Sequence, residues 1–313
     1  MSSTPFCAGQ GQWVDTADVW SNAQSVFALV DSTVYQNSGS GWSPLFESST
    51  TFGDLTGFAD GPLVLTARSA SRCGILFLDG DGLRCSGAAQ NVYRVFTVDR
   101  RLAYSVANGR LLVYRGDFWT QAGGVLALTG TYGGSLWADA QQAIVSGGSG
   151  EVFRYDLESD SASALPPYSD SAEALALWGF GPDDLWLATD AAELLHYDGN
   201  GWQFFLSLQD TDGNIRGMWG QDGVLYFHTA TTVFRAQGNR IERILSLPPD
   251  DWQSRSVRSL WGNSPSEVFI AIQNYRIDAV VHPDGQIEHV ASPADSCGAI
   301  RLLYFDGERV GQL

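Results

Sequence analysis

The chain has 313 residues, of which 44% are hydrophobic and 17% charged, so it can bury a large core and lacks the composition of a disordered protein. Its formal net charge is −17, and all 18 basic residues are Arg. A surface this acidic repels phosphate backbones, and a chain without Lys has no Schiff-base chemistry, so we expect no nucleic-acid partner and no catalysis of that kind.

Cysteine usage and apolar run lengths indicate where the protein works. No apolar run approaches the about 18 residues that a transmembrane helix needs, so no transmembrane segment is expected. The four cysteines are dispersed, which favours two disulfides in an oxidising compartment over a zinc or thiol site. The N-terminal residues lack the features of a signal peptide. We expect an extracellular, periplasmic or cell-surface protein whose export signal is absent from this sequence.

An aromatic residue recurs along the chain at intervals of roughly forty residues, which is typical of a propeller, a solenoid or an array. The aligned positions are Trp20, Phe58, Phe96, Trp137, Trp178, Trp219, Trp261 and Tyr304. Within one copy, "ALALWG", "DLWLAT", "ELLHYD" and "WQFFLS" alternate at period two and are separated by turns. Four strands in a repeat of this length indicate a propeller blade.

The sequence therefore predicts an all-β fold, a single β-propeller over residues 1–313 with eight four-stranded blades. Seven blades are expected at 17–46, 55–87, 92–122, 134–165, 174–206, 215–247 and 257–290. The eighth joins residues 299–313 to residues 2–15, so that both termini share it. The alternative is seven blades, with one weak early copy misread. "LLYFDG" at 302–307 also resembles the third strand "LLHYDG", which leaves the shared blade open.

Both predicted disulfides follow from this organisation. Cys7 and Cys297 fall in the shared blade, where a bond between them would close the propeller. In the loop-entropy model, a bridge across so long a loop stabilises by about 4–5 kcal/mol. Cys73 and Cys85 flank a predicted hairpin that turns near Gly80, so they face each other across two strands.

The copy at 177–202 resembles a repeat of secreted and lipid-anchored proteins of myxobacteria and related bacteria. Its matching residues are Leu177, Trp178, Gly179, Pro182, Asp184, Leu185, Trp186, Leu195, His196, Tyr197, Asp198, Gly199 and Trp202. The resemblance implies a propeller in a cell-surface or extracellular setting and implies no activity. We interpret Trp178 and Trp186 as wedge fillers between blades, and Trp202 as packing on an outer strand.

Binding residues are expected on the loops that join the second strand to the third, and the fourth strand to the next blade. These loops combine aromatic side chains with Arg, a composition typical of protein or glycan contacts. The candidates are Tyr168, Trp252, Tyr275, Arg276, Arg68, Arg72 and Arg255. We expect a non-catalytic module that binds a glycan or a protein, with a structural subunit of an envelope complex as one alternative.

A polysaccharide hydrolase or lyase is the other alternative, and whether the protein is an enzyme stays open. It would need carboxylates that converge at the propeller axis, whereas the acidic pairs Asp183–Asp184 and Asp250–Asp251 are better explained as turns. His196 and His282 take similar places in predicted third strands, which favours a structural role. No catalytic residue is assigned.

Two short motifs have alternative interpretations as turns. Asp210, Asp212 and Asn214 begin like a calcium loop, but Gln221 stands where the bidentate Glu belongs, so a turn is preferred and no cofactor is expected unless calcium binds there. "RGD" at Arg115–Asp117 lies in a predicted hairpin, which accounts for it without a recognition role.

Overall fold

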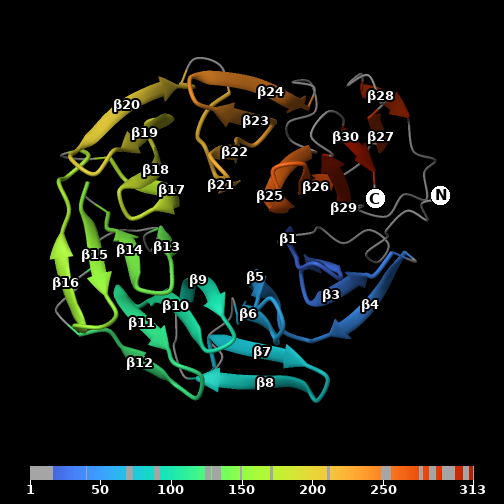
Figure 1. Ribbon diagram of the computed structural model, residues 1–313. Coiled ribbons are helices and arrows are strands. Elements are labelled where there is room, and N and C mark those ends of the chain that lie inside the picture. The colour runs from blue at the N-terminus through green and yellow to red at the C-terminus, as the bar shows by residue number, and fades with distance from the viewer. Residues whose placement is uncertain are drawn as a thin grey trace. The chain divides into compact units, whose positions relative to one another are not determined.

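The computed structural model describes residues 17–39, 41–67, 73–87, 92–123, 128, 135–148, 150–169, 172–209, 212–247, 255–274, 278–281, 287–290, 300–305 and 310–312. All regular elements of these residues are β-strands (Figure 1). Among them, no helix has the length and apolar character that crossing a bilayer would require. The chain divides into two compact units, residues 1–51 with 217–313 and residues 52–216.

The second unit holds four antiparallel sheets, each made of four strands consecutive in the chain. They are β5 (Phe52–Gly57), β6 (Leu63–Ala67), β7 (Ile75–Asp79) and β8 (Gly82–Gly87); β9 (Val92–Asp99), β10 (Leu102–Ala107), β11 (Arg110–Tyr114) and β12 (Trp119–Gln121); β13 (Leu136–Ala138), β14 (Gln142–Ser146), β15 (Val152–Asp156) and β16 (Ser161–Ala164); and β17 (Ala174–Gly181), β18 (Asp184–Thr189), β19 (Glu193–Tyr197) and β20 (Trp202–Ser207). The first strands β5, β9, β13 and β17 contact one another in chain order.

The first unit holds three four-stranded sheets and a separate hairpin. They are β1 (Ala17–Ser21), β2 (Val26–Val30), β3 (Thr33–Asn37) and β4 (Trp42–Glu47); β21 (Gly217–Gln221), β22 (Val224–His228), β23 (Thr232–Gln237) and β24 (Arg240–Ser246); β25 (Arg255–Ser264), β26 (Glu267–Asn274), β29 (Ile300–Phe305) and β30 (Val310–Gln312); and the hairpin β27 (Asp278–Val281) with β28 (Ile287–Val290). Six of the seven four-stranded sheets thus use consecutive strands, and the last is interrupted by the hairpin.

Burial follows the order of strands within a sheet. The second strands β6, β10 and β22 are buried at every residue, so both of their faces are covered and their sequences are almost continuously apolar. The fourth strands β4, β16 and β20 are largely exposed. The core therefore lies over the first, second and third strands, and the fourth strand forms an edge of each sheet.

The register of the first two strands confirms the repeat. First-strand aromatics pair with bulky residues of the second strand, as in Trp20↔Phe27, Trp178↔Trp186 and Trp219↔Tyr226, whereas Phe58 lies just beyond β5. The weakly matching early copies also form sheets of their own, with Phe96 paired to Tyr104. The early copies were therefore read correctly, and the number of blades falls below eight for a different reason.

The prediction of an eighth blade shared by the termini is wrong. β29 pairs with β26, which places Tyr304 opposite Phe269, so residues 300–312 supply the third and fourth strands of the sheet that β25 begins. The hairpin β27–β28, taken from sequence as the outer half of the blade at 257–290, is an insertion between β26 and β29. An apolar pair of strands separated by a turn has the same pattern in either place. Residues 2–15 and Cys7–Cys297 lie outside the described residues.

Contacts between the first and last sheets replace the expected closure. β1 contacts β25 and β26, and an apolar cluster joins Val19 and Ala28 to Phe269 and Ala271. The hydroxyl of Ser21 donates a 2.8 Å hydrogen bond to Oδ1 of Asn263. Segments from near the two ends of the chain are thus held together by packing and hydrogen bonds.

Candidate functional site

The described part of the predicted loop site is used for internal contacts. The hydroxyl of Tyr168 donates to the carbonyl of Ala172 at 2.9 Å, and its ring lies 6.0 Å from that of Trp202. Burial raises the pKa of Tyr168 to about 12. Trp202 lies on the outer strand β20, as expected, and its Nε1 donates to the carbonyl of Pro166 at 2.9 Å. Tyr168 and Trp202 therefore fix the loop between β16 and β17.

Most of the other candidates lie outside the described residues, namely Arg68, Arg72, Trp252, Tyr275 and Arg276. Arg255 is the first residue of β25, and only its backbone is described. The binding role of these residues therefore stays a prediction.

The calcium candidate is described only in part. Asp210 lies outside the described residues, while the backbone amide of Asp212 donates to the carbonyl of Leu208 at 3.1 Å, as in a turn. Asn214 is exposed. Within the described residues, no three His, Cys, Asp or Glu side chains come together in a way that would hold a metal.

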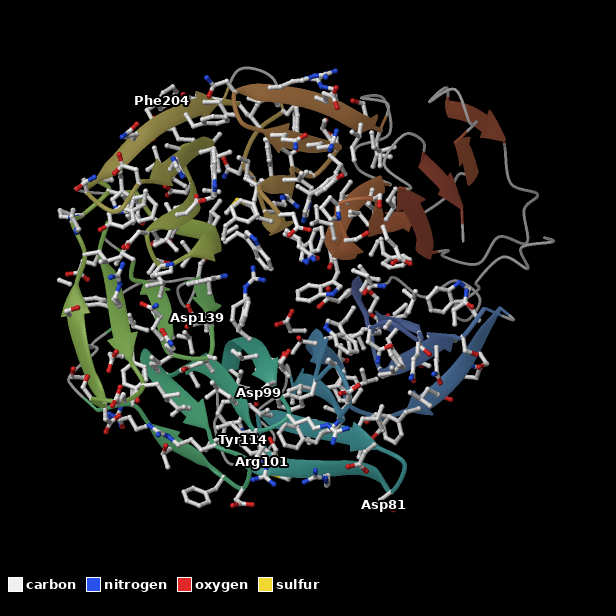
Figure 2. All side chains as sticks on the ribbon, in the orientation of Figure 1. Asp81, Asp99, Arg101, Tyr114, Asp139 and Phe204 are labelled. Carbon is white, nitrogen blue, oxygen red and sulfur yellow. A yellow bond between two sulfur atoms is a disulfide. The ribbon has the colours of Figure 1, made fainter. Side chains whose placement is uncertain are left out.

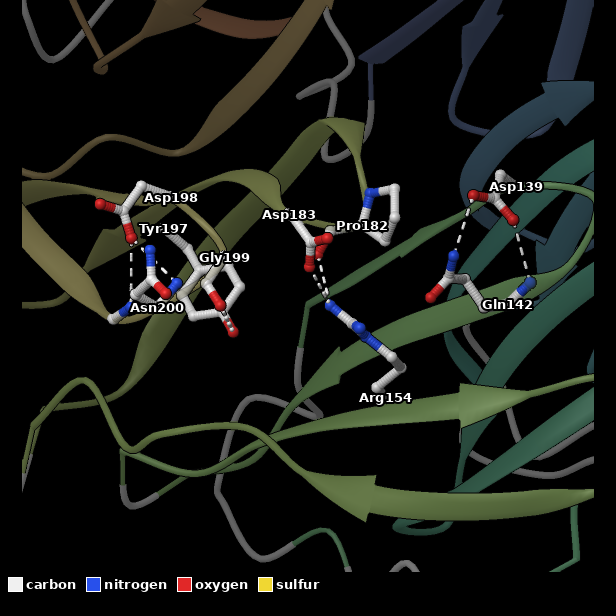
Figure 3. Close-up of polar contacts among 10 residues, drawn as sticks. Asp139, Gln142, Arg154, Pro182, Asp183, Tyr197, Asp198, Gly199 and Asn200 are labelled. Atoms are coloured by element: carbon white, nitrogen blue, oxygen red, sulfur yellow. Dashed lines mark hydrogen bonds and ion pairs between the residues drawn. The ribbon is translucent and has the colours of Figure 1, made fainter.

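The acidic turn residues have more contacts than the sequence indicated (Figure 3). Nη2 of Arg154 forms an ion pair with Oδ1 of Asp183 at 2.8 Å. The same nitrogen donates a hydrogen bond to the carbonyl of Pro182 at 2.6 Å. Arg154 lies on β15 and Asp183 in the turn before β18, so this contact joins two neighbouring sheets. The sequence predicted the turn but carried no signal for its partner.

The Asp-Gly turn of the repeat forms as predicted. Asp198 accepts hydrogen bonds from the amides of Asn200 and Gly201 at 3.0 and 3.2 Å, which hold its pKa below the ordinary value (Figure 3). Gly199 adopts a φ of 91°, a conformation that favours glycine. This carboxylate stabilises a hairpin and is not available as an acid.

His196 has the structural position that its sequence context suggested. Its Nε2 lies 2.8 Å from Oδ1 of Asp184, and its ring stacks on Trp186 with centroids 4.4 Å apart. Trp186 also contacts Phe205 of the same sheet at 4.8 Å. His282 lies outside the described residues; β27, which ends at Val281, belongs to the inserted hairpin and is not a third strand.

The "RGD" segment forms the predicted hairpin between β11 and β12. Nη2 of Arg115 lies 3.4 Å from the hydroxyl of Tyr155 and 3.5 Å from the carbonyl of Leu157, both in the next sheet. Tyr155 in turn donates to Oδ1 of Asp160 at 2.6 Å. Desolvation raises the pKa of Tyr155 to about 12, and the hydrogen bond from Tyr155 lowers that of Asp160.

The first strands of the second unit bring aromatic rings together. Phe96 of β9 and Trp178 of β17 lie 6.0 Å apart, although the sheet of β13 stands between theirs in the chain. Trp137 of β13 lies against the backbone of Gly179. Trp178, interpreted from the sequence as a wedge filler between blades, thus contacts a ring of another sheet.

Sequence analysis missed the exposed apolar residues of the fourth strands. Four large hydrophobic side chains are exposed among the described residues, and each lies on a fourth strand or directly before one: Leu45, Phe118, Phe204 and Ile241. Phe118 and Phe204 are 65% and 63% exposed (Figure 2 labels Phe204). The available signal was the Phe-Phe pair in "WQFFLS", because neighbouring residues of a strand point to opposite faces.

The only disulfide within the described residues is the predicted one. Cys73 and Cys85 are joined, with their Cα atoms 5.8 Å apart, and they link the start of β7 to β8. The bond therefore fixes the outer hairpin of the β5–β8 sheet, and it is the kind of crosslink that persists in oxidising compartments.

Comparison with known proteins identifies the fold and no family. No family model matches the sequence, and no curated protein matches it either. YCF48 from Cyanidioschyzon merolae aligns with a TM-score of 0.63 at 12% identity, over 96% of this chain and 99% of that one. A structure of YCF48 bound to D1 peptide gives 0.61 at 13% identity, over 94% and 99%.

Two longer proteins align with part of their length. The extracellular domain of a putative one component system from B. thetaiotaomicron gives a TM-score of 0.57 at 10% identity, over 84% of this chain and 38% of that one. PorZ, a surface component of the type-IX secretion system of Porphyromonas gingivalis, gives 0.59 at 12% identity, over 97% and 46%. The chain thus spans less than half of these two proteins. Together with the repeated sheets, these likenesses define an all-β propeller with four-stranded blades.

Proposed function

We propose that this propeller is a non-catalytic binding module of an extracellular, periplasmic or cell-surface compartment, and that its partner is a protein. The observation that carries the proposal is the position of the exposed hydrophobic residues. Leu45, Phe204 and Ile241 belong to fourth strands, and Phe118 lies directly before one. Exposed aromatic side chains are enriched where proteins bind proteins, and fourth strands offer unpaired edges.

Three further observations support the proposal. Phe96 and Trp178, both on first strands of the second unit, pack on each other, which is in keeping with a non-catalytic module. The solved likenesses include a complex with a peptide, an extracellular domain and a surface secretion component. The Cys73–Cys85 disulfide is in keeping with an oxidising compartment.

A structural subunit of an envelope complex is the second candidate, because the exposed hydrophobic residues are spread over four different sheets. Such a subunit would contact partners through several fourth strands at once. A module with one ligand would use a single strand. The same experiment separates the two.

The test places a photocrosslinking amino acid at each of positions 45, 118, 204 and 241 in turn, with Asp81 and Asn200 as exposed hairpin controls. Each variant is irradiated with envelope proteins of the source organism. Protein adducts at fourth-strand positions and none at the controls would support the proposal. Adducts at several of the four would favour the structural subunit. Adducts at none of the four, or binding to glycans alone, would overturn it.

A further inference from the structure

β20 lacks the usual protection of an edge strand. Proteins protect edge strands with charges, proline or short length, because an unprotected edge pairs with other chains. β4 carries Pro44 and Glu47, β8 carries Arg84, and β24 carries Arg240, Glu242 and Arg243; β12, β16 and β30 have three or four residues. β20, "WQFFLS", has six residues, no charge and no proline.

The exposed side chains of β20 are those of Gln203, Phe204 and Ser207. Within the described residues, β20 pairs with β19 alone. Trp202 at its start is held by Pro166, and Phe205 packs inward on Trp186 at the bulge of the strand. Phe204 is then left pointing outward, 63% exposed. The strand offers both main-chain groups and an aromatic anchor.

The β17–β20 sheet supplies only acidic formal charges, although Arg154 of the neighbouring sheet pairs with its Asp183. No Arg or Lys occurs between Arg154 and Arg216, and this stretch includes the whole β17–β20 sheet. The sheet carries Asp183, Asp184, Asp190, Glu193 and Asp198. Glu193 lies directly beside the strand, paired with Ser207. A positively charged segment would be attracted here, while a second copy of this chain, with a net charge of −17, would be repelled.

We infer that the free edge of β20, residues 203–207, binds an extended, Arg- or Lys-rich segment of another protein by adding it as a fifth strand to the β17–β20 sheet. The main chain of the segment pairs with β20, its apolar side chains cover Phe204, and its basic side chains meet the surrounding carboxylates. The inference rests on the proposed protein-binding function and names the strand and the chemistry of the partner.

The test measures fluorescence anisotropy of a labelled synthetic peptide in which Arg alternates with Val. We expect saturable binding that weakens as salt is raised, and no binding of the peptide with Glu in place of Arg. N-methylation of every peptide bond removes the main-chain donors from both edges of the peptide and is expected to abolish binding. Equal binding of the Glu peptide, or of the N-methylated peptide, would overturn the inference.

Two matched variants locate the site. Phe204→Ser is expected to raise Kd about 10- to 30-fold, because an aromatic anchor is lost. Phe118→Ser removes an equally exposed Phe directly before another fourth strand, β12, and is expected to leave Kd unchanged. Glu193→Gln should reduce the salt dependence. An equal loss in Phe118→Ser, or none in Phe204→Ser, would contradict the assignment.

The remaining outcomes are also decisive. A dimer of the parent protein in sedimentation velocity that is lost in Phe204→Ser would assign the edge to a second copy and overturn the inference. Absence of peptide binding together with protein adducts at positions 45, 118 or 241 would overturn this inference alone. Absence of adducts at all four positions overturns the proposed function itself.

Discussion

Trp137 packs directly on the backbone of Gly179 in the next sheet. A Cβ atom built on Gly179 would lie 2.9 Å from Cδ2 of the Trp137 ring and 2.8 Å from Cδ2 of Leu185. The same relationship recurs in the first unit, where a Cβ on Gly262 would lie 2.6 Å from Cη2 of Trp219. The Trp-Gly pair of the repeat is thus an interlock, in which one copy supplies the ring and the next supplies the space.

Gly179→Ala should therefore destabilise the protein. Overpacking of this kind typically lowers the free energy of unfolding by about 1–3 kcal/mol. Gly181→Ala is the matched control in the same strand, because nothing lies within 4 Å of its added Cβ. Its effect should stay below about 0.5 kcal/mol. Urea unfolding of both variants measures the difference, and equal losses would contradict the interlock.

The stability of the protein should fall at alkaline pH. Desolvation raises the pKa of Tyr155 to about 12 from its ordinary value of 10.0, so the folded state holds this proton more tightly than the unfolded state. The stabilisation is complete below the ordinary value and is lost as pH rises toward 12. Tyr155→Phe should flatten this part of the curve of unfolding free energy against pH. An unchanged slope would show that Tyr155 does not contribute.

The hydrogen bond from Tyr155 should also control the titration of Asp160. This bond holds the pKa of the carboxyl below its ordinary value. In Tyr155→Phe the pKa of Asp160 should rise toward that value, which carboxyl NMR titration measures. Asp198, whose pKa is lowered by backbone amides of its own turn, serves as the internal reference and should not move.

The ion pair between Arg154 and Asp183 should contribute little to stability. The Asp183 side chain is 64% exposed, and pairs at such positions are typically worth about 0.2–1 kcal/mol. Arg154→Ala should cost more than Asp183→Ala, because Arg154 also donates to the carbonyl of Pro182. A double-mutant cycle isolates the coupling between the two side chains. A coupling well above this range would mean that the pair is shielded from solvent.

Reduction should loosen the β5–β8 sheet selectively. Cys73 and Cys85 are separated by 12 residues, and closing a loop of similar size stabilises by about 3 kcal/mol in the entropy model. Cys73→Ser with Cys85→Ser should lower unfolding stability by roughly this amount, and amides of β7 and β8 should exchange faster than those of β17 and β18. Peptide mapping without reductant should recover the Cys73–Cys85 crosslink and tests whether Cys7 is joined to Cys297.

Local features of the fold could be predicted from the sequence because their causes are local. Alternation at period two defined the strands, the Asp198 turn followed from its Asp-Gly pair, and the spacing of Cys73 and Cys85 around a turn defined their bond. The last sheet could not be predicted, because β27–β28 and β29–β30 are both apolar hairpins of the right size. Which pair joins β26 depends on tertiary contacts.

The candidate site was predictable only in part. The sequence identified Tyr168 as an aromatic loop residue, but its bond to Ala172 and its contact with Trp202 depend on the folded loop. Phe204 and Phe205 look equivalent in sequence, and the register that sets Gln203 opposite His196, and His196 opposite Trp186, decides that Phe205 packs on Trp186. The ion pair between Arg154 and Asp183 joins two sheets, and no pattern in the sequence indicates it.

Hydrogen–deuterium exchange with and without the Arg–Val peptide tests the binding account most directly. If the peptide adds a strand to β20, exchange at amides of residues 203–207 should slow in its presence, and exchange at the fourth strands β4 and β24 should stay the same. Slower exchange only in the loops between sheets, with β20 unchanged, would contradict the account and would place the peptide-binding site on the loops instead.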